Sequence, residues 1–225
     1  MNAPRRVKVA IVDYDIGNLF SVMRACRYAG LEAAVTSDKR AMASSDALIL
    51  PGVGAFGHAM EHLRMLDLVS FLKDFAAQGK PFLGVCLGMQ LLMESSEEFG
   101  AHEGLGIIEG AIVRFPPTGA EGERVRVPHI GWTAVTFASK VASKDPIFTG
   151  VPDGSHMYFV HSFCVKPARE EDVLATAAYH GVGFCAGIKK GNVYAFQFHP
   201  EKSGSVGLAL YRNFKHIVEH QEVCT

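Results

Sequence analysis

The segment Gly84-Val85-Cys86-Leu87-Gly88 places a cysteine between two glycines, directly after an apolar run that is typical of a buried strand. A helical pattern starts at Leu87, so Cys86 is expected at a sharp strand-to-helix turn that projects its side chain above a sheet. The glycines permit this tight fold, and the N-terminus of the helix favours a thiolate. The pattern predicts a nucleophilic cysteine; from these residues alone, a buried structural cysteine is the alternative.

A cysteine nucleophile needs a base, and the segment Phe196-Gln197-Phe198-His199-Pro200-Glu201 offers one. A strand is predicted to end at Phe198, so His199 emerges at the sheet edge where ligands bind in open α/β folds. Glu201 follows a proline that stiffens the chain, and its carboxylate can orient the imidazole. By itself the pair is typical of a solvated loop, but together with Cys86 it predicts a Cys-His-Glu triad.

The segment Pro51-Gly52-Val53-Gly54 follows a third apolar strand over residues 47–50. Its two glycines leave backbone amides that can approach a ligand closely, although a plain strand-to-helix loop is the alternative. The spacing Gly52-x-Gly54-x-x-Gly57 is that of a dinucleotide-binding turn. It comes after the third strand rather than the first, and no acidic ribose partner is evident, so nucleotide binding is not predicted.

These segments must be positioned by a sheet whose strands deliver side chains to one edge. Strands alternate with helices over the first hundred residues, which predicts an α/β fold with a mixed, mostly parallel sheet flanked by helices. After Gly110 the predicted strands follow one another through turns, which indicates added antiparallel strands in the second half. The predicted strands cover residues 7–12, 33–36, 47–50, 82–85, 112–115, 133–137, 157–161, 173–178, 184–188 and 193–198. The first predicted helix follows Asn18 and stops at Gly30. The other predicted helices cover 55–78 with a break near Asp67, 87–95, and 203–220 with Ser203 as N-cap.

The composition limits the class of protein. Lys and Arg number 22 and Asp and Glu 23, so the chain lacks the basic excess expected of a protein that binds nucleic acid or anionic membranes. A length of 225 residues favours a single domain over residues 1–225, with two small domains as the alternative. Five scattered cysteines without a C-x-x-C pair, and no long apolar run, predict a cytoplasmic protein.

The three chemical segments together, in this order, resemble a class I, triad-type glutamine amidotransferase domain over nearly the whole chain. The resemblance implies that family's fold, and hydrolysis of glutamine to glutamate and ammonia through a cysteine thioester. It implies Cys86 as nucleophile, His199 as base and acid, and Glu201 as the orienting acid. No metal and no cofactor is implied.

The same resemblance implies which residues surround the reacting amide. The oxyanion hole is expected from Gly52, Val53 and the amide of Leu87. The glutamine-binding residues are expected to be Gly52, Gly54, Gln90, Ser162 and Phe163.

Further segments are similar to the glutaminase subunits of imidazole glycerol phosphate synthase, which serves histidine biosynthesis. They are Asp15-Ile16-Gly17-Asn18-Leu19, Pro128-His129-Ile130-Gly131-Trp132, Tyr158-Phe159-Val160-His161-Ser162 and His199-Pro200-Glu201-Lys202-Ser203. Without the triad, the second segment is typical of a turn with one buried tryptophan. Asp15 stands where this family usually has glycine, and Phe163 stands where tyrosine is common.

This second resemblance implies a partner. In the family the glutaminase forms a heterodimer with a (β/α)8 cyclase subunit, which receives the ammonia and makes imidazole glycerol phosphate and aminoimidazole carboxamide ribotide. Asn18, Trp132 and Lys202 match positions near that interface. Asn18 can also cap the helix that follows it, and Lys202 can be a solvated charge.

Three other functions stay open at this stage. They are a sister amidotransferase for anthranilate or pyridoxal phosphate synthesis, a catalytically dead module on the same fold, and a cysteine peptidase or thioester hydrolase. The intact Cys86, His199 and Glu201 set argues against the dead module. Two histidine pairs at helical spacing, His58 with His62 and His216 with His220, are expected on exposed helix faces rather than around a metal.

Overall fold

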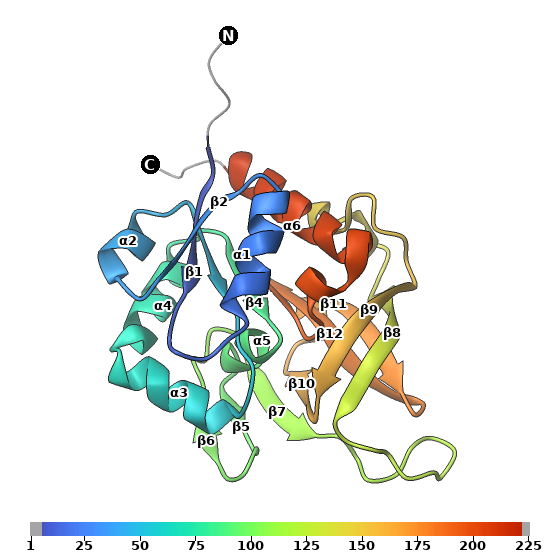
Figure 1. Cartoon of the computed structure of the whole chain (residues 1–225). Coiled ribbons are helices and arrows are strands. Elements are labelled where there is room, and N and C mark those ends of the chain that lie inside the picture. Colours follow the sequence, from blue (N-terminus) through green and yellow to red (C-terminus); the bar gives the residue numbers. More distant parts are fainter. Residues whose placement is uncertain (1–5, 222–225) are drawn as a thin grey trace.

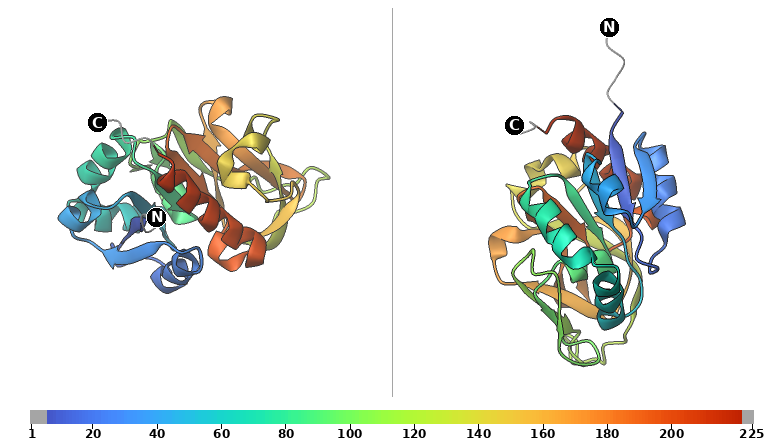
Figure 2. Two further views of the ribbon diagram at one scale, coloured as in Figure 1. Left: turned by 90° about the horizontal axis from the view of Figure 1, so that it is seen from above. Right: turned by 90° about the vertical axis from the view of Figure 1, so that its left-hand side faces the viewer.

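The computed structural model describes residues 6–221 and shows a central sheet with helices packed on both faces (Figures 1 and 2). The strands are β1 (Lys8–Val12), β2 (Glu32–Thr36), β3 (Ala47–Leu50), β4 (Phe82–Val85), β5 (Ser95–Ser96), β6 (His102–Glu103), β7 (Gly110–Arg114), β8 (His129–Phe137), β9 (Ser155–His161), β10 (Phe163–Pro167), β11 (Val173–Tyr179), β12 (Val182–Lys190) and β13 (Val193–Phe196). The α-helices are α1 (Leu19–Tyr28), α2 (Lys39–Ala43), α3 (Phe56–Met65), α4 (Leu68–Ala77), α5 (Leu87–Leu91) and α6 (Gly204–Glu219).

The first half of the sheet is parallel. Its strand order is β2-β1-β3-β4-β13, and every neighbouring pair in this run is parallel. The helices α1 and α6 contribute to the core on one face, whereas α2, α3 and α4 contribute to the core on the other. The strands read as continuous apolar runs because both of their faces are covered. The α/β sheet with flanking helices is therefore confirmed.

The second half of the sheet is antiparallel. From β13 the sheet continues through β12, β10 and β7, and each of these pairs is antiparallel. A branch from β12 leads through β11 and β8 to β9, which lies on the side of the molecule away from α2, α3 and α4 (Figure 1). The predicted antiparallel strands of the second half are confirmed.

Several predicted boundaries are wrong, and strand pairing explains two of them. The helix predicted over 87–95 ends at Leu91, because Ser95 and Ser96 leave it to pair with β6 and β7. The strand predicted from residue 133 begins at His129, because β8 pairs with β9 from His129 to Val135 despite Gly131 and the preceding Pro128. The last strand ends at Phe196 rather than at residue 198. Neither α2 nor β10 was predicted.

Ser203 occupies the N-cap position of α6, but its side chain does not cap the helix. Its hydroxyl donates to the carbonyl oxygen of His199 at 2.7 Å and accepts from the amide of Tyr158 at 2.9 Å. The hydroxyl therefore connects the segment after β13 to strand β9. Among residues 6–221, no helix is long and apolar enough to cross a lipid bilayer.

Candidate active site

Cys86 lies at a strained turn between β4 and α5. Its backbone has φ 55° and ψ −111°, a region that L-residues rarely adopt. The amide of Cys86 donates to the carbonyl oxygen of Phe196 at 2.8 Å, which holds the turn against β13. Strain of this kind persists where the surrounding structure enforces it, and it is concentrated at functional sites. The turn is the strand-to-helix elbow that the sequence predicts.

The glycine after the cysteine is required by close packing. A Cβ atom at Gly88 would overlap the carbonyl oxygen of Leu50, at the end of the neighbouring strand β3. At Gly84, a Cβ atom would lie 3.1 Å from that of Ala195 on β13 and 3.0 Å from the side chain of Leu92. Glycine at both positions thus lets α5 begin directly against the sheet.

His199 and Glu201 form a buried pair just beyond β13. Nδ1 of His199 lies 2.8 Å from Oε1 of Glu201, and the two side chains are 2% and 1% exposed. The amide of His199 donates to the carbonyl oxygen of Tyr158 at 2.9 Å, so the backbone of this segment is also fixed. Because Nδ1 faces Glu201, Nε2 is the nitrogen left to exchange a proton with another group.

The electrostatics favour a charged imidazole. Burial lowers the pKa of His199, but the neighbouring groups of Cys86 and Glu201, the latter hydrogen-bonded to Nδ1, outweigh burial and raise this pKa to about 9. His199 is therefore protonated at neutral pH. A charged imidazole beside the sulfur of Cys86 is the arrangement that activates the nucleophile of cysteine enzymes.

The other described cysteines have a different environment. Burial raises the pKa of the thiols of Cys26, Cys164 and Cys185 to about 12 in each case. They remain protonated at neutral pH and act as small apolar side chains. Cys86 is thus the only described cysteine with a histidine partner that can activate it.

A pocket of about 220 Å³ opens beside Cys86. Gly52 lies next to it, and a side chain there would overlap the hydroxyl of Tyr14 and the side chain of Leu87. The backbone after Gly52 passes through Gly54 in the left-handed region, with φ 96°. The pocket therefore brings together the nucleophile and segments from three distant parts of the chain, lined by Val53, Gly54, Cys86, Leu87, Gln90, Glu98, Pro128, Val160, His161, Ser162 and Phe163.

A family model of class-I glutamine amidotransferases matches residues 10–217. The chain belongs to the class-I glutamine amidotransferase family. The imidazole glycerol phosphate synthase subunit HisH of Rhodopirellula baltica is 48% identical over 206 residues, which cover 92% of this chain and 96% of that protein. The subunit HisH of Geobacter sulfurreducens is 44% identical over 208 residues, covering 92% and 97%. The predicted family and the predicted enzyme class are confirmed.

Solved structures support the fold alone. A glutamine amidotransferase of known crystal structure is 20% identical, with a TM-score of 0.69 over 93% of this chain and 98% of that one. A glutamine amidotransferase from Thermotoga maritima is 14% identical, with a TM-score of 0.63 over 96% and 100%. This chain therefore has the amidotransferase fold. The similarity to HisH subunits favours the glutaminase over the sister amidotransferases, the dead module and the peptidase.

Gln197 is a polar residue of this amidotransferase that the sequence analysis did not single out. It is fully buried, its Nε2 lies 3.8 Å from Sγ of Cys86, and its Oε1 accepts from Nε2 of Gln90 at 3.0 Å. Nε2 of Gln90 also donates to the carbonyl oxygen of Phe163 at 3.3 Å. The only signal in the sequence is a polar residue between Phe196 and Phe198, directly after the apolar strand β13.

The residues expected at the partner interface lie in two places. Trp132 on β8 is 55% exposed, so the alternative of a buried tryptophan is wrong. Its ring is 6.1 Å from that of Tyr158, and Nζ of Lys202 is 5.7 Å from the same tyrosine ring. Asn18 accepts from the amide of Ser21 at 3.4 Å and thus does cap α1.

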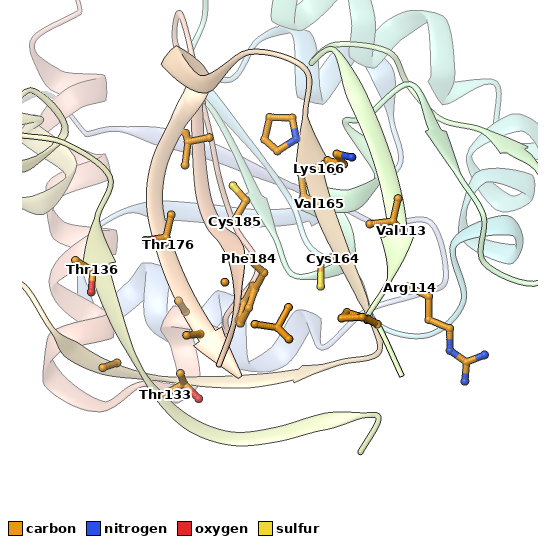
Figure 3. A pocket seen from close by; sticks show the side chains of 18 residues that line it. Val113, Arg114, Thr133, Thr136, Cys164, Val165, Lys166, Thr176, Phe184 and Cys185 are labelled. Atoms are coloured by element: carbon orange, nitrogen blue, oxygen red, sulfur yellow. The ribbon is translucent and has the colours of Figure 1, made fainter. Parts of the chain in front are cut away.

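A larger hollow of about 860 Å³ lies on the antiparallel half of this amidotransferase (Figure 3). Its walls come from β7, β8, β10, β11 and β12, and its lining is mainly apolar. Figure 3 shows the inert thiols Cys164 and Cys185 among the lining side chains. None of the three triad side chains lines this hollow, so its size does not mark the reacting centre.

Histidine pairs on helices could in principle hold a metal. Within residues 6–221, one group brings three ligand atoms together, namely His216, Glu219 and His220. Glu219 pairs with Lys215 at 3.3 Å, and Nδ1 of His220 lies 2.9 Å from the carbonyl oxygen of His216. These groups are already engaged on an open helix end, so they are a poor match for a catalytic metal site.

Proposed function

We propose that this chain is the glutaminase subunit of an imidazole glycerol phosphate synthase and that it releases ammonia from glutamine for a cyclase partner. One observation carries the proposal. In a chain that is 44–48% identical to HisH subunits, Cys86 occupies a strained elbow that adjoins the buried His199–Glu201 pair. The domain is proposed to span residues 1–225 and to work in the cytoplasm.

The chemistry follows from the geometry of the triad. Sγ of Cys86 attacks the side-chain amide carbon of glutamine, and the carbonyl oxygen becomes an oxyanion. Nε2 of His199 then gives its proton to the departing nitrogen, so ammonia leaves and a thioester remains. Water attacks the thioester while His199 takes one of its protons. Glutamate leaves, and the thiolate is restored. Glu201 holds the ring and stabilises its charged form.

The oxyanion is proposed to be held by backbone amides on both sides of the sulfur. The amide of Leu87 stands at the first turn of α5, directly after the nucleophile. Gly52 and Val53 lie on the segment that faces it, and Gly54 beside them adopts a positive φ of 96°. Glycines on both sides of Val53 allow its peptide planes to rotate, so that an amide can point toward the oxyanion or away from it. The loss of one oxyanion donor lowers the rate by about 10²–10³-fold.

Glutamine itself is proposed to bind between two walls of the 220 Å³ pocket. Gly54 lines one wall, with Gly52 next to it against Leu87, and Gln90, Ser162 and Phe163 line the other. Phe163 is left with a backbone contact, shared with Ser162, because the phenyl ring lacks the hydroxyl of the tyrosine that is common there. Its carbonyl oxygen already accepts from His161 and Gln90. The departure from the family pattern therefore leaves a backbone contact and removes a side-chain contact.

The cyclase partner, a (β/α)8 barrel, is proposed to dock on the face that carries Ile130 and Trp132, which are 58% and 55% exposed. Lys202 adjoins this face through Tyr158, and Tyr158 in turn lies 6.3 Å from the ring of His199. Asn18 stands at the start of α1. A partner on this face would thus sit beside the triad, and its preference for one arrangement of the Val53 peptide would activate the enzyme.

The test is co-purification of the full chain with a cyclase subunit, followed by glutamine turnover with and without the cyclase's nucleotide ligand. We expect the isolated chain to be nearly inactive and the complex with nucleotide to be at least 10²-fold faster. Substitution of Trp132 or Lys202 should lower the activated rate more than the basal rate. Equal rates for the isolated chain and the complex would contradict the proposed coupling.

A further inference from the structure

Two buried histidines face each other behind the glutamine pocket. His129 on β8 and His161 on β9 are directly opposite in the strand register, and they are 2% and 6% exposed. Nδ1 of His129 lies 3.1 Å from Nε2 of His161. Neither residue belongs to the triad, and neither has a role in the chemistry described above.

The protons of this pair have one consistent arrangement. A carbonyl oxygen can only accept, so Nδ1 of His161 must donate to the carbonyl oxygen of Phe163, 2.9 Å away. Burial lowers the pKa of His161 to about 3, so this ring is neutral and its Nε2 is an acceptor. Nδ1 of His129 must then donate to it. Nε2 of His129 is left to accept from the hydroxyl of Thr133 at 2.9 Å.

The hydrogen-bond chain therefore runs in one direction, from Thr133 through His129 and His161 to Phe163. Burial also lowers the pKa of His129, to about 4, which keeps that ring neutral at physiological pH. Each ring has one donor and one acceptor nitrogen, and all four nitrogens are used. If one ring changed tautomer, two donors or two acceptors would face each other.

One end of the chain acts on the glutamine pocket. The carbonyl oxygen of Phe163 accepts from His161 and also from Nε2 of Gln90. Nε2 of Gln90 reaches Oε1 of Gln197 as well, and Gln197 adjoins the sulfur of Cys86. A shift of this carbonyl would thus move one wall of the pocket.

The other end of the chain lies under the exposed face of β8. Side chains alternate along a strand, so His129 and Thr133 point inward whereas Ile130 and Trp132 point outward. The outer residues are the exposed ones that the proposed docking face contains. A partner that binds this face and displaces strand β8 would therefore also displace the backbone of His129.

We propose that His129 and His161 are positioning residues that fix the Ser162–Phe163 turn for glutamine and connect it to the exposed face of β8. The alternative is that the two rings only fill an aromatic cluster with Phe159, Tyr179 and Phe184, which they contact. Apolar rings would fill that space equally well, but they could not make an oriented chain of hydrogen bonds. The inference rests on the proposed glutaminase function for its kinetic consequences.

The first experiment separates the hydrogen bonds from the packing. Thr133→Val removes the hydroxyl that starts the chain and keeps the side-chain shape, and Thr133→Ser is the matched control that keeps the hydroxyl. In the complex with cyclase and nucleotide, Thr133→Val should raise KM for glutamine about 5-fold, with a smaller change in kcat. Thr133→Ser should match the wild type. Equal KM values for all three proteins would overturn the proposal.

The second experiment does not depend on turnover. Nitrogen-15 NMR of histidine-labelled chain should show both rings neutral, with the proton on Nδ1. A proton on Nε2 of either ring in the wild type would overturn the proposal. His129→Phe, which keeps the packing, is expected to raise KM at least as much as Thr133→Val does. Failure of the wild-type complex to hydrolyse glutamine would contradict the proposed function. The NMR result would still show whether the proposed hydrogen bonds of His129 and His161 are present.

Discussion

Nδ1 of His199 lies 2.8 Å from Oε1 of Glu201, and both side chains are almost completely withdrawn from solvent. The pair is only two residues apart, and Pro200 between them begins a short 3-10 turn. That turn folds the carboxylate back onto the imidazole. The base His199 and its orienting acid Glu201 thus come from one short segment. The nucleophile Cys86 lies more than a hundred residues earlier in the sequence.

Replacing Cys86 by Ala or Ser should abolish glutamine hydrolysis while the fold is retained. A serine hydroxyl is far less acidic than a thiol, and the charged His199 is placed to balance a thiolate. The measurement is glutamine turnover of the complex, with free ammonia at high pH as a second substrate for the cyclase. Cys164→Ala is the matched control and should keep the glutaminase activity. Residual turnover above a few per cent in Cys86→Ala would refute the nucleophile.

His199→Ala should cost orders of magnitude in kcat, because members of a catalytic unit fail together. Glu201→Gln should cost less, because the carboxylate orients the ring and does not transfer the proton. Steady-state kinetics of both variants in the activated complex measure the difference. An equal loss in the two variants would mean that Glu201 has a more direct part in proton transfer.

The raised pKa of His199 predicts how activity depends on pH. The charged ring is the acid that protonates the leaving ammonia, so kcat/KM for glutamine should fall about tenfold per pH unit above about 9. In Glu201→Gln the fall should begin at lower pH, because the carboxylate no longer stabilises the cation.

The raised pKa of His199 also stabilises the folded chain below pH about 6.5, and this contribution disappears as the pH rises through about 9.

The buried pair His129–His161 predicts sensitivity to acid. Both pKa values are depressed, to about 4 and about 3, so the stabilisation is present above pH about 6.5 and is lost as the pH falls. The free energy of unfolding should decrease by up to about 1.4 kcal/mol per pH unit for each histidine. Urea unfolding at pH 7.5, 6 and 5 measures this. His161→Gln should flatten the dependence, and His220→Gln, at an exposed position, should not change it.

Asp15→Gly should stabilise the chain by about 0.5–1 kcal/mol, because an L-residue in the left-handed region is strained and glycine is not. Asp15 has φ 65° at the position where the family usually has glycine. The long contact of 3.8 Å between its carboxylate and His62 is exposed and contributes little. Asp38→Gly is the control, because Asp38 has an ordinary φ and caps α2. Chemical denaturation should show the opposite sign there.

The placement of Cys86 and His199 beyond strand ends could be predicted from the sequence because each follows a run of apolar residues. Cys86 and His199 come directly after or shortly after such strands, and the parallel sheet brings those strand ends together. The strand from Ala47 to Leu50 was predicted with both boundaries correct for the same reason.

The antiparallel half was harder to predict because pairing between distant strands, rather than local preference, decides its strands. Gly131 and Pro128 made the start of β8 resemble a turn, although His129 begins the strand. The register between distant strands places His129 opposite His161. Gln197 likewise makes its contacts with residues that are far away in the sequence. No periodicity within a single segment contains that information.

The contrast between the thiols has a practical consequence for measurement. Of the described cysteines, three have pKa values near 12, and Cys86 alone faces a charged imidazole beside an open pocket. A mild alkylating reagent applied at neutral pH should therefore modify Cys86 before Cys26, Cys164 and Cys185. In a Cys224→Ser variant, which removes the cysteine outside the described residues, the reagent consumed in that first phase would count the competent molecules, so that rates can be expressed per working site rather than per milligram.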